Sequence, residues 1–337
     1  MSTHSVVIVG ATGLVGTTLI SLLEEKKFPL KKIYFVASKQ STHKEICFKG
    51  QNYGIHDLAD FDFTQTDIAF FCVSNELAAK YIPIATSAGN IVIDKSSYYR
   101  IHNDVPLLVP EVNIDQLLDY RRMNIIANPN CNVIPIAVGL KPIYNAVGIT
   151  RMNISTYQSV SGTGKEAVIE LAEQTQQLLN NQLVQPKVYQ QQIAFNVLPH
   201  CDEFQENGYT REEMKVVLEL QKIFQDKSLA INPTAVRVPV FYAHAASVHI
   251  ETKDKITASQ AIQLLTNAPG VKLITGQYPY PTPALDATGN DYVCVGRVRE
   301  DISHPYGLNL WIVTDNLRKG AALNALQIAE HLIKNHL

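Results

Sequence analysis

Val6-Val7-Ile8-Val9-Gly10-Ala11-Thr12-Gly13-Leu14-Val15-Gly16 is the stretch that decides the fold of the first part of the chain. Its four leading apolar residues are typical of a strand buried in a parallel sheet. Glycines follow at every third position, and leucines then continue at helical spacing: Leu19, Leu22 and Leu23. Gly10 permits a tight turn, and Gly13 lets the backbone approach a pyrophosphate. A strand, a glycine turn and a helix in this order favour a dinucleotide-binding site over a plain tight turn.

The second predicted strand, 33–36, indicates which dinucleotide binds. A site selective for NAD usually has Asp or Glu at the end of this strand, where it binds the ribose hydroxyls. This chain has Ala37-Ser38-Lys39-Gln40-Ser41 instead. Hydroxyl groups and a lysine would hold the 2′-phosphate of NADP, which a carboxylate would repel. NADP is therefore the predicted cofactor, and the alternative interpretation of Lys39 is a solvated loop charge.

The composition is that of an ordinary globular protein. With 337 residues, of which 46% are hydrophobic and 18% are charged, the chain is long enough for two domains. A formal net charge of −2 argues against a nucleic-acid-binding protein. The N-terminus has no basic region followed by an apolar core, and the apolar run at 5–10 is far too short to span a membrane. We expect a cytoplasmic protein with no membrane or nucleic-acid partner.

Cys131 stands out among five widely spread cysteines, no two of which have metal-ligand spacing. We therefore predict neither a metal site nor a disulfide framework. Cys131 ends Ile125-Ile126-Ala127-Asn128-Pro129-Asn130-Cys131, an apolar run and a turn, and another apolar stretch begins at Ile134. At such a strand-to-helix junction, backbone N–H groups and the helix dipole favour the thiolate. The alternative is a buried free cysteine that acts as a small apolar side chain.

A second glycine turn lies in the other half of the chain. A strand predicted over 154–160 contains Gln158, and Ser161-Gly162-Thr163-Gly164 then leads into a helix that starts near Lys165. The turn either contacts another part of the cofactor or only caps the helix. Gln158 is either a functional amide or an ordinary half-buried strand residue.

Charged residues further along the chain are candidates for substrate binding and catalysis. Arg237 interrupts the β-branched run 236–240, where an unpaired charge is costly. It suits either bidentate capture of a carboxylate or a structural salt bridge. His244 lies among small apolar residues and is either a hydrogen-bonded core residue or an acid–base group. Glu212 and Lys215 share one face if a helix starts there, although acidic first turns also occur without any function.

Several strings, in order, make the chain resemble the aspartate-semialdehyde dehydrogenases over nearly its whole length. Beside Gln158, Arg237 and His244, they are the glycine turn at 10–16, Asp104-Val105-Pro106, Pro110-Glu111-Val112-Asn113, Asn128-Pro129-Asn130-Cys131, Ser161-Gly162-Thr163-Gly164, Gly296-Arg297-Val298-Arg299 and Asp315-Asn316-Leu317-Arg318-Lys319-Gly320-Ala321-Ala322. The resemblance implies reduction of L-aspartyl 4-phosphate by NADPH to L-aspartate 4-semialdehyde and phosphate. This reaction serves the biosynthesis of diaminopimelate and lysine, threonine and methionine.

The resemblance also implies a role for each candidate residue. Cys131 would be the nucleophile, His244 the acid–base catalyst and Gln158 the residue that positions the acyl intermediate. The substrate-binding residues would be Arg237 for the α-carboxylate, Glu212 for the amino group and, for the phosphate, Arg100, Asn130 and Lys215. The cofactor-binding residues would be Gly10, Thr12, Gly13, Leu14, Val15, Ser38, Lys39, Ser41, Ser161, Gly162, Gly164 and Asn316.

Three places depart from the family pattern. Asn132-Val133 stands where Ser-Thr is usual, Lys95 stands where Asn is common, and 39–43 reads Lys-Gln-Ser-Thr-His where Arg-Ser-Ala-Gly is usual. The first concerns helix capping after the nucleophile, and the other two concern the preference for NADP.

Two alternative functions remain at this point. The first is an N-acetyl-γ-glutamyl-phosphate reductase, against which Glu212 argues, because a free amino group needs a carboxylate partner and an N-acetyl group does not. The second is a nucleotide-sensing regulatory protein without turnover, against which the complete set of catalytic residue types argues.

We therefore predict an α/β fold with two domains. A Rossmann-like NADP-binding domain covers 1–131 and is completed by a C-terminal helix in 316–337, and a mixed α+β catalytic and dimerisation domain covers 132–315. Apolar residues at helical spacing indicate the final helix: Ala321, Leu323, Ala325, Leu326, Ile328, Ala329 and Leu332. Its return to the first domain and a homodimer formed through the second domain are implied by the resemblance.

Overall fold

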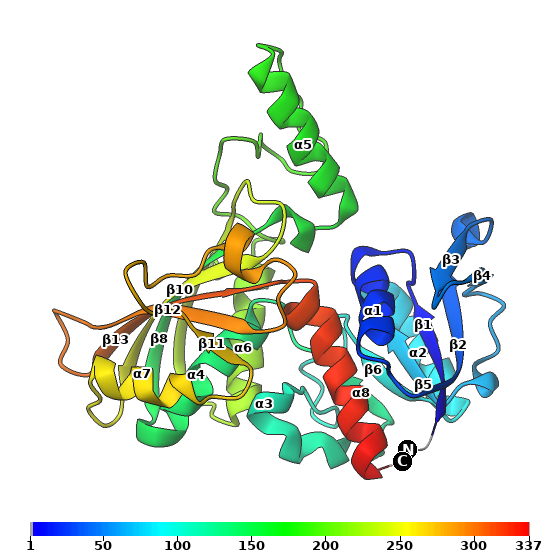
Figure 1. The fold of residues 1–337 in the computed structure, drawn as a ribbon, viewed down its shortest axis with the longest axis horizontal. Coiled ribbons are helices and arrows are strands. Elements are labelled where there is room, and N and C mark those ends of the chain that lie inside the picture. The colour runs from blue at the N-terminus through cyan, green and yellow to red at the C-terminus, as the bar shows by residue number, and fades with distance from the viewer. Residues whose placement is uncertain (1–2, 337) are drawn as a thin grey trace. The chain divides into compact units, whose positions relative to one another are not determined.

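The computed structural model describes residues 3–336, which divide into two compact units (Figure 1). The first unit contains the chain up to Asn130 and the C-terminal segment from Ala321, and the second contains Cys131–Gly320. The predicted domain limits place Cys131 and 316–320 with the first domain. By their contacts these residues lie with the second unit instead.

The first unit is built on a seven-stranded sheet with the order β3-β4-β2-β1-β5-β6-β7. Its strands are β1 (His4–Val9), β2 (Leu30–Ala37), β3 (Glu45–Phe48), β4 (Gln51–Asp57), β5 (Ile68–Phe71), β6 (Ile91–Asp94) and β7 (Ile125–Ala127). Only β3 runs antiparallel to its neighbour. The carboxyl ends of β1, β2 and β4 therefore lie at one edge of the sheet, where open α/β sheets bind ligands.

Helices from both ends of the chain pack on this sheet. They are α1 (Leu14–Glu25), α2 (Asn75–Ser87), the short α3 (Pro110–Asn113) and α8 (Leu323–His336). α1 and α8 contribute apolar side chains to one buried cluster with β1, β2 and β5. Within that unit, Asn324 of α8 donates to the Leu108 carbonyl at 2.9 Å and to Asn128 Oδ1 at 2.8 Å. The C-terminal helix thus fixes the turn after β7.

The second unit is built on a mixed six-stranded sheet with the order β11-β12-β13-β10-β8-β9. Its strands are β8 (Ile149–Gln158), β9 (Ala230–Arg237), β10 (His244–Thr252), β11 (Val271–Leu273), β12 (Val293–Glu300) and β13 (Gly307–Thr314). The inner pairs are antiparallel and the outer pairs, β11 with β12 and β8 with β9, are parallel. A parallel α/β unit and a mixed α+β unit together confirm the predicted fold class.

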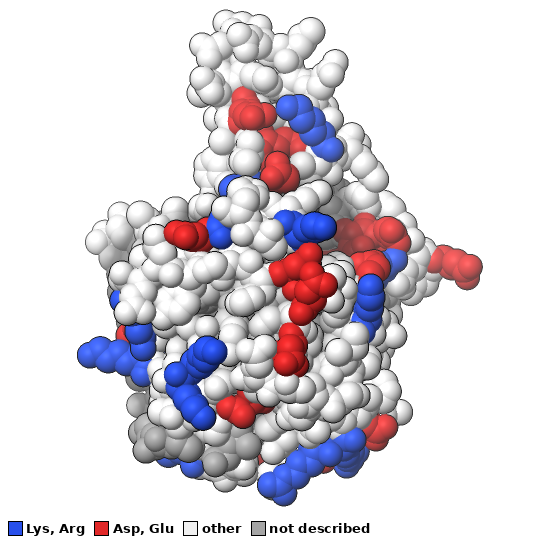
Figure 2. Space-filling model, turned by 90° about the vertical axis from the view of Figure 1, so that its right-hand side faces the viewer, with Lys and Arg blue, Asp and Glu red and all other residues white. Residues whose placement is uncertain are grey.

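Three helices pack on the second sheet, α4 (Val133–Val147), α6 (Arg211–Phe224) and α7 (Ala258–Thr266), whereas α5 (Lys165–Leu179) projects away from it (Figure 1). Across residues 3–336, no helix is long and apolar enough to cross a membrane. Acidic and basic side chains both occur on the face in Figure 2, and neither sign covers it.

Candidate active site

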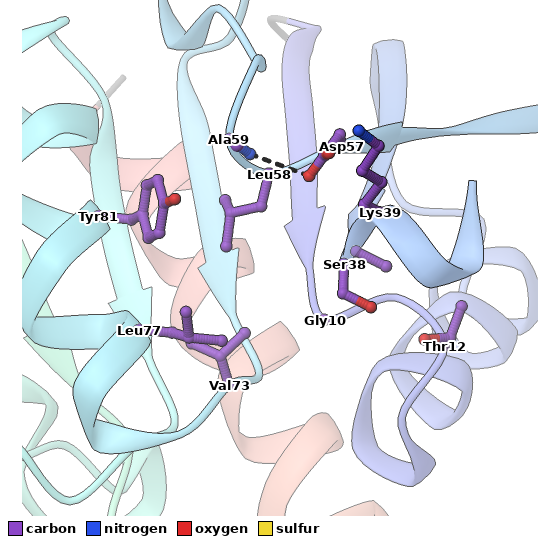
Figure 3. A pocket seen from close by; sticks show the side chains of 11 residues that line it. Gly10, Thr12, Ser38, Lys39, Asp57, Leu58, Ala59, Val73, Leu77 and Tyr81 are labelled. Atoms are coloured by element: carbon purple, nitrogen blue, oxygen red, sulfur yellow. Dashed lines mark hydrogen bonds between the residues drawn. The ribbon is translucent and has the colours of Figure 1, made fainter.

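A pocket of about 290 Å³ lies in the first unit, where β1, β2 and β4 end (Figure 3). Four predicted cofactor residues line it: Gly10, Thr12, Ser38 and Lys39. In Figure 3, Val73, Leu77 and Tyr81 lie across the pocket from Ser38 and Lys39. The pocket therefore combines an apolar wall with a polar, basic wall, as a site for a nucleotide requires.

Gly10 forms the floor of the turn between β1 and α1. Its φ is +86°, and a Cβ atom there would lie 2.3 Å from the carbonyl oxygen of Cys72. Any other residue would therefore be both strained and overlapping. The turn leads to Gly13, the N-cap of α1, which has no side chain to cover the backbone N–H groups of the first turn. Backbone N–H groups at such a helix start suit an anionic phosphate.

The structure does not place every predicted cofactor residue in this pocket. Gly13, Leu14, Val15 and Ser41 are not among its lining residues, and Ser161, Gly162, Gly164 and Asn316 belong to the second unit. Conversely, the sequence analysis missed six residues that do line it: Asp57, Leu58, Ala59, Val73, Leu77 and Tyr81. Asp57 ends β4 and accepts a hydrogen bond from the Ala59 N–H at 3.1 Å. It was missed because β4 has no continuous apolar run and because strand order cannot be read from the chain.

Arg100 and Asn130 are both buried side chains of the first unit. The Arg100 guanidinium donates to the backbone carbonyls of Asn128 at 3.0 Å and Lys95 at 2.7 Å. These contacts hold the guanidinium against the Asn-Pro-Asn turn that ends in Asn130. The structure thus brings together two of the three predicted phosphate-binding residues. The third, Lys215, belongs to the second unit.

Cys131 lies between the end of β7 at Ala127 and the start of α4 at Val133, at the predicted strand-to-helix junction. Its side chain is half-buried. Gly320 packs directly against it, since a Cβ atom at Gly320 would lie 3.4 Å from the Cys131 Cβ. The closing string of the family pattern therefore lies beside the predicted nucleophile.

Glu212 and Lys215 lie in the first turn of α6, as predicted. Thr210 and Glu213 form a capping box that fixes where this helix starts. The Glu212 carboxylate accepts hydrogen bonds from Asn132 Nδ2 at 3.0 Å, Gln158 Nε2 at 3.4 Å and Lys215 Nζ at 3.3 Å. Lys215 also contacts Asp202 Oδ2 at 2.7 Å, a partner that sequence analysis missed. The predicted amino-group ligand is thus buried and held on both oxygens.

Arg237 and His244 lie at one edge of the second sheet. Gln158 and Arg237 end the parallel strands β8 and β9 in register, and His244 begins β10 on the other side of β8. Arg237 Nη1 donates to the Ser159 carbonyl at 2.8 Å. Among the residues that the structure describes, two buried side-chain nitrogens lack a hydrogen-bond partner, Arg237 Nε and His244 Nε2.

His244 is held as a neutral imidazole. Burial, and then the nearby Arg237 charge, lower its pKa from 6.5 to about 3. Its Nδ1 accepts a hydrogen bond from the Ser159 backbone N–H at 3.0 Å, and Ser159 Oγ lies 3.1 Å from the same nitrogen. Because a backbone N–H can only donate, the ring proton lies on Nε2. The unpartnered Nε2 is therefore a donor.

The second glycine turn lies against these catalytic candidates. Gly162 packs closely on both side chains, since a Cβ atom there would lie 3.0 Å from His244 Nε2 and 3.1 Å from Arg237 Nη1. Asn316 Oδ1 accepts hydrogen bonds from Ser161 Oγ at 3.1 Å and the Ala243 N–H at 2.9 Å. In the second unit, therefore, Gly162 contacts His244 and Arg237. Ser161 and Asn316 are joined by a hydrogen bond.

Two family models match most of the chain. The model "Semialdehyde dehydrogenase, NAD binding domain" matches residues 5–120, and "Semialdehyde dehydrogenase, dimerisation domain" matches residues 140–319. Two features agree with this class. The first unit has a pocket that suits a nucleotide, and the second unit contains Cys131 together with acidic, basic and imidazole side chains. The chain has the two domains of a semialdehyde dehydrogenase, which is an oxidoreductase.

Individual relatives narrow this class. Aspartate-semialdehyde dehydrogenases from Shewanella sp. (strain DB6705) and Legionella pneumophila are each 52% identical, over 98% and 100% of this chain and 98% of each relative. The solved structure of aspartate semialdehyde dehydrogenase II from Vibrio cholerae, complexed with ASA, has a TM-score of 0.98 at 50% identity over the full length of both chains. The chain belongs to the aspartate-semialdehyde dehydrogenase family, as predicted, and these similarities favour neither alternative function.

Proposed function

We propose that this chain catalyses the NADPH-dependent reduction of L-aspartyl 4-phosphate to L-aspartate 4-semialdehyde and phosphate, in the biosynthesis of lysine, threonine and methionine. The observation that carries the proposal is the set of side chains in the second unit. A half-buried cysteine, Cys131, lies in the same unit as a buried carboxylate, Glu212, and two buried donors with no partner, Arg237 Nε and His244 Nε2.

The two unpartnered donors suit an anionic substrate. Leaving a buried donor without a partner costs about 1–3 kcal/mol, a cost that a bound acceptor removes. We assign Arg237 to the substrate α-carboxylate, since a guanidinium can bind its two oxygens together. Glu212 then binds the α-ammonium group. An N-acetylated substrate would place an uncharged amide against this carboxylate.

Cys131 begins the reaction as a thiolate. Its sulfur attacks the acyl carbon of the substrate, the bond from that carbon to the phosphate oxygen breaks, and phosphate leaves with the electron pair. Arg100, Asn130 and Lys215 donate hydrogen bonds to the departing phosphate. The product of this step is a thioester on Cys131, which Gln158 holds by its side-chain amide.

His244 acts as a hydrogen-bond donor through Nε2. The negative charge that develops on the carbonyl oxygen is stabilised by the Nε2–H group, which is already in place and buried from water. The sequence prediction that His244 also assists thiolate formation requires an Nε2 without a proton. The Ser159 N–H on Nδ1 opposes that tautomer, so the donor role is the one this geometry supports.

When bound, NADPH would supply a hydride to the thioester carbon, and Cys131 would then leave as the thiolate. The pocket of the first unit fits such a dinucleotide, because Gly10 leaves room for its phosphates and the apolar wall with Tyr81 suits an adenine ring. Lys39 and Ser38 would hold the 2′-phosphate. Asp57 lines the same pocket and would favour ribose hydroxyls, so the preference for NADP depends on Lys39.

We further propose that the enzyme is a cytoplasmic homodimer that pairs through its second unit. The family model for this part of the chain is a dimerisation domain, which supports this assembly. The proposed function is tested by following NADP reduction in the presence of L-aspartate 4-semialdehyde. We expect reduction to require inorganic phosphate and N-acetyl-glutamate semialdehyde to be a poor substrate. Reduction independent of phosphate, or equal rates with both aldehydes, would refute the assignment.

A further inference from the structure

Asn132, the residue directly after the predicted nucleophile, is buried and only 2% exposed. It precedes the first residue of α4, and its backbone is already helical, with φ −86° and ψ −32°. A residue that caps a helix by its side chain has extended backbone angles instead. Accordingly, Asn132 makes no side-chain cap hydrogen bond. Its side chain is therefore placed by something other than helix capping.

The Asn132 side-chain amide lies between Cys131 and Glu212. Its Nδ2 donates to Glu212 Oε1 at 3.0 Å and lies 4.0 Å from Cys131 Sγ. A carboxylate can only accept hydrogen bonds, so the amide must turn its nitrogen toward Glu212. The same nitrogen is therefore shared between Glu212 Oε1 and Cys131 Sγ.

This position matters because both neighbours are anions in the proposed reaction. A carboxylate near a thiol disfavours the thiolate, since like charges repel. A donor shared by the two groups opposes that repulsion, and Lys215 and Gln158 act on the same carboxylate from other sides. The Asn132 nitrogen also lies 4.0 Å from the sulfur, so it acts on both groups.

We propose that Asn132 is a positioning residue for the reaction: its amide holds Glu212 in place for the substrate ammonium and stabilises the Cys131 thiolate. This inference rests on the proposed function, because it takes Cys131 as the nucleophile and Glu212 as the ammonium ligand. The departure from the usual Ser at this position thus has a structural role. The amide nitrogen reaches both Glu212 and Cys131, whereas a serine hydroxyl is a shorter donor with one hydrogen.

The test compares variants that keep or remove the N–H donor. Asn132→Leu has a similar branched shape and no donor, and Asn132→Ser keeps one hydroxyl donor. The rate of Cys131 alkylation by iodoacetamide is followed against pH, with the modified peptide quantified by mass spectrometry because Cys47 is also exposed. We expect Asn132→Leu to slow alkylation at pH 7 by about tenfold, the size of a lost hydrogen bond to a charged group. Its alkylation profile should move to higher pH, and Asn132→Ser should lie between the two.

Steady-state kinetics give a second readout. In Asn132→Leu, Glu212 loses a contact that holds it in place. We therefore expect a higher KM for L-aspartate 4-semialdehyde and a lower kcat, whereas the KM for NADP stays constant. Asn153→Leu, a half-buried amide of β8 that bonds to His249, is the matched control and should leave both the alkylation profile and these constants unchanged. If Asn132→Leu does not fold, Asn132→Ser and Asn132→Asp are compared, since both residues are good N-caps. The ionised Asp can only accept, so it should alkylate more slowly than Ser.

An unchanged alkylation profile and unchanged KM in Asn132→Leu, or equal profiles for the Ser and Asp variants, would overturn the inference. These outcomes are distinct from failure of the proposed function. If Cys131→Ser keeps its turnover, the nucleophile is wrong and both proposals fail. If Cys131→Ser is inactive while the Asn132 variants behave as wild type, only the role of Asn132 fails.

Discussion

The backbone N–H of Ser159 donates a hydrogen bond to Nδ1 of His244 over 3.0 Å, and this bond decides which ring nitrogen carries the proton. It leaves Nε2 as a buried donor beside Gly162. The Ser159 N–H therefore favours the proposed role of His244 as a neutral donor over the role of an acid–base catalyst.

The depressed pKa of His244 predicts a pH dependence of stability. The folded protein lowers this pKa from 6.5 to about 3, chiefly by burial, so the unfolded state binds more protons between these values. The contribution of His244 to the free energy of unfolding is complete above pH 6.5 and is lost progressively as the pH falls toward 3. In urea titrations, stability should fall more steeply between pH 7 and pH 5 in the wild type than in His244→Gln. Parallel pH dependences for the two proteins would contradict this assignment.

Arg237→Lys should separate bidentate binding from simple charge. An ammonium keeps the charge but cannot bind both oxygens of a carboxylate together. We expect kcat/KM for L-aspartate 4-semialdehyde to fall by roughly 100-fold, with most of the change in KM, as for a lost charged hydrogen bond. Arg151→Lys, at an exposed site of β8, is the control and should have wild-type kinetics. An Arg237→Lys enzyme with unchanged KM would rule out the anchor role.

Gly162→Ala tests the close packing of the second glycine turn. The added methyl would lie 3.0 Å from His244 and 3.1 Å from Arg237, so one of these side chains must move. We expect kcat/KM to fall by about tenfold or more, because small displacements of catalytic groups are costly. Gly54→Ala, where a Cβ atom meets nothing within 4 Å, is the matched control. Equal activity of both variants would show that the turn tolerates a side chain.

Lys39→Ala tests the origin of the cofactor preference. Removing a charge partner of the 2′-phosphate should lower kcat/KM with NADP by about tenfold and leave the value with NAD unchanged. Lys44→Ala, at an exposed position nearby in the sequence, should change neither value. If Lys39→Ala lowers the efficiency with both cofactors equally, then Lys39 does not read the phosphate.

The sequence predicted those features that local chemistry determines. The run 6–9 with its glycine turn specified β1, the turn and α1, and the Asn-Pro-Asn turn before Cys131 specified a strand-to-helix junction. The capping box at Thr210 set the first turn of α6, so Glu212 and Lys215 shared a face as expected. The family was confirmed because several such strings occur in one order.

Contacts between distant residues could not be predicted in this way. Asp57 lines the dinucleotide pocket only because β4 lies next to β2, and β4 carries no pattern that distinguishes it. The tautomer of His244 depends on Ser159, which directly follows the neighbouring strand β8 and is 85 residues away in the sequence. The sequence also presented Asn132 as a question of helix capping, whereas its amide lies between Cys131 and Glu212.

The central claim is that Cys131 forms a thioester, and Cys131→Ser tests it most directly. The measurement is phosphate-dependent reduction of NADP by L-aspartate 4-semialdehyde, with NADP binding followed separately by fluorescence. We predict that turnover falls by roughly a thousandfold or more, since a serine hydroxyl is a far weaker nucleophile here, while the Kd for NADP is unchanged. Turnover close to that of the wild type would contradict the mechanism.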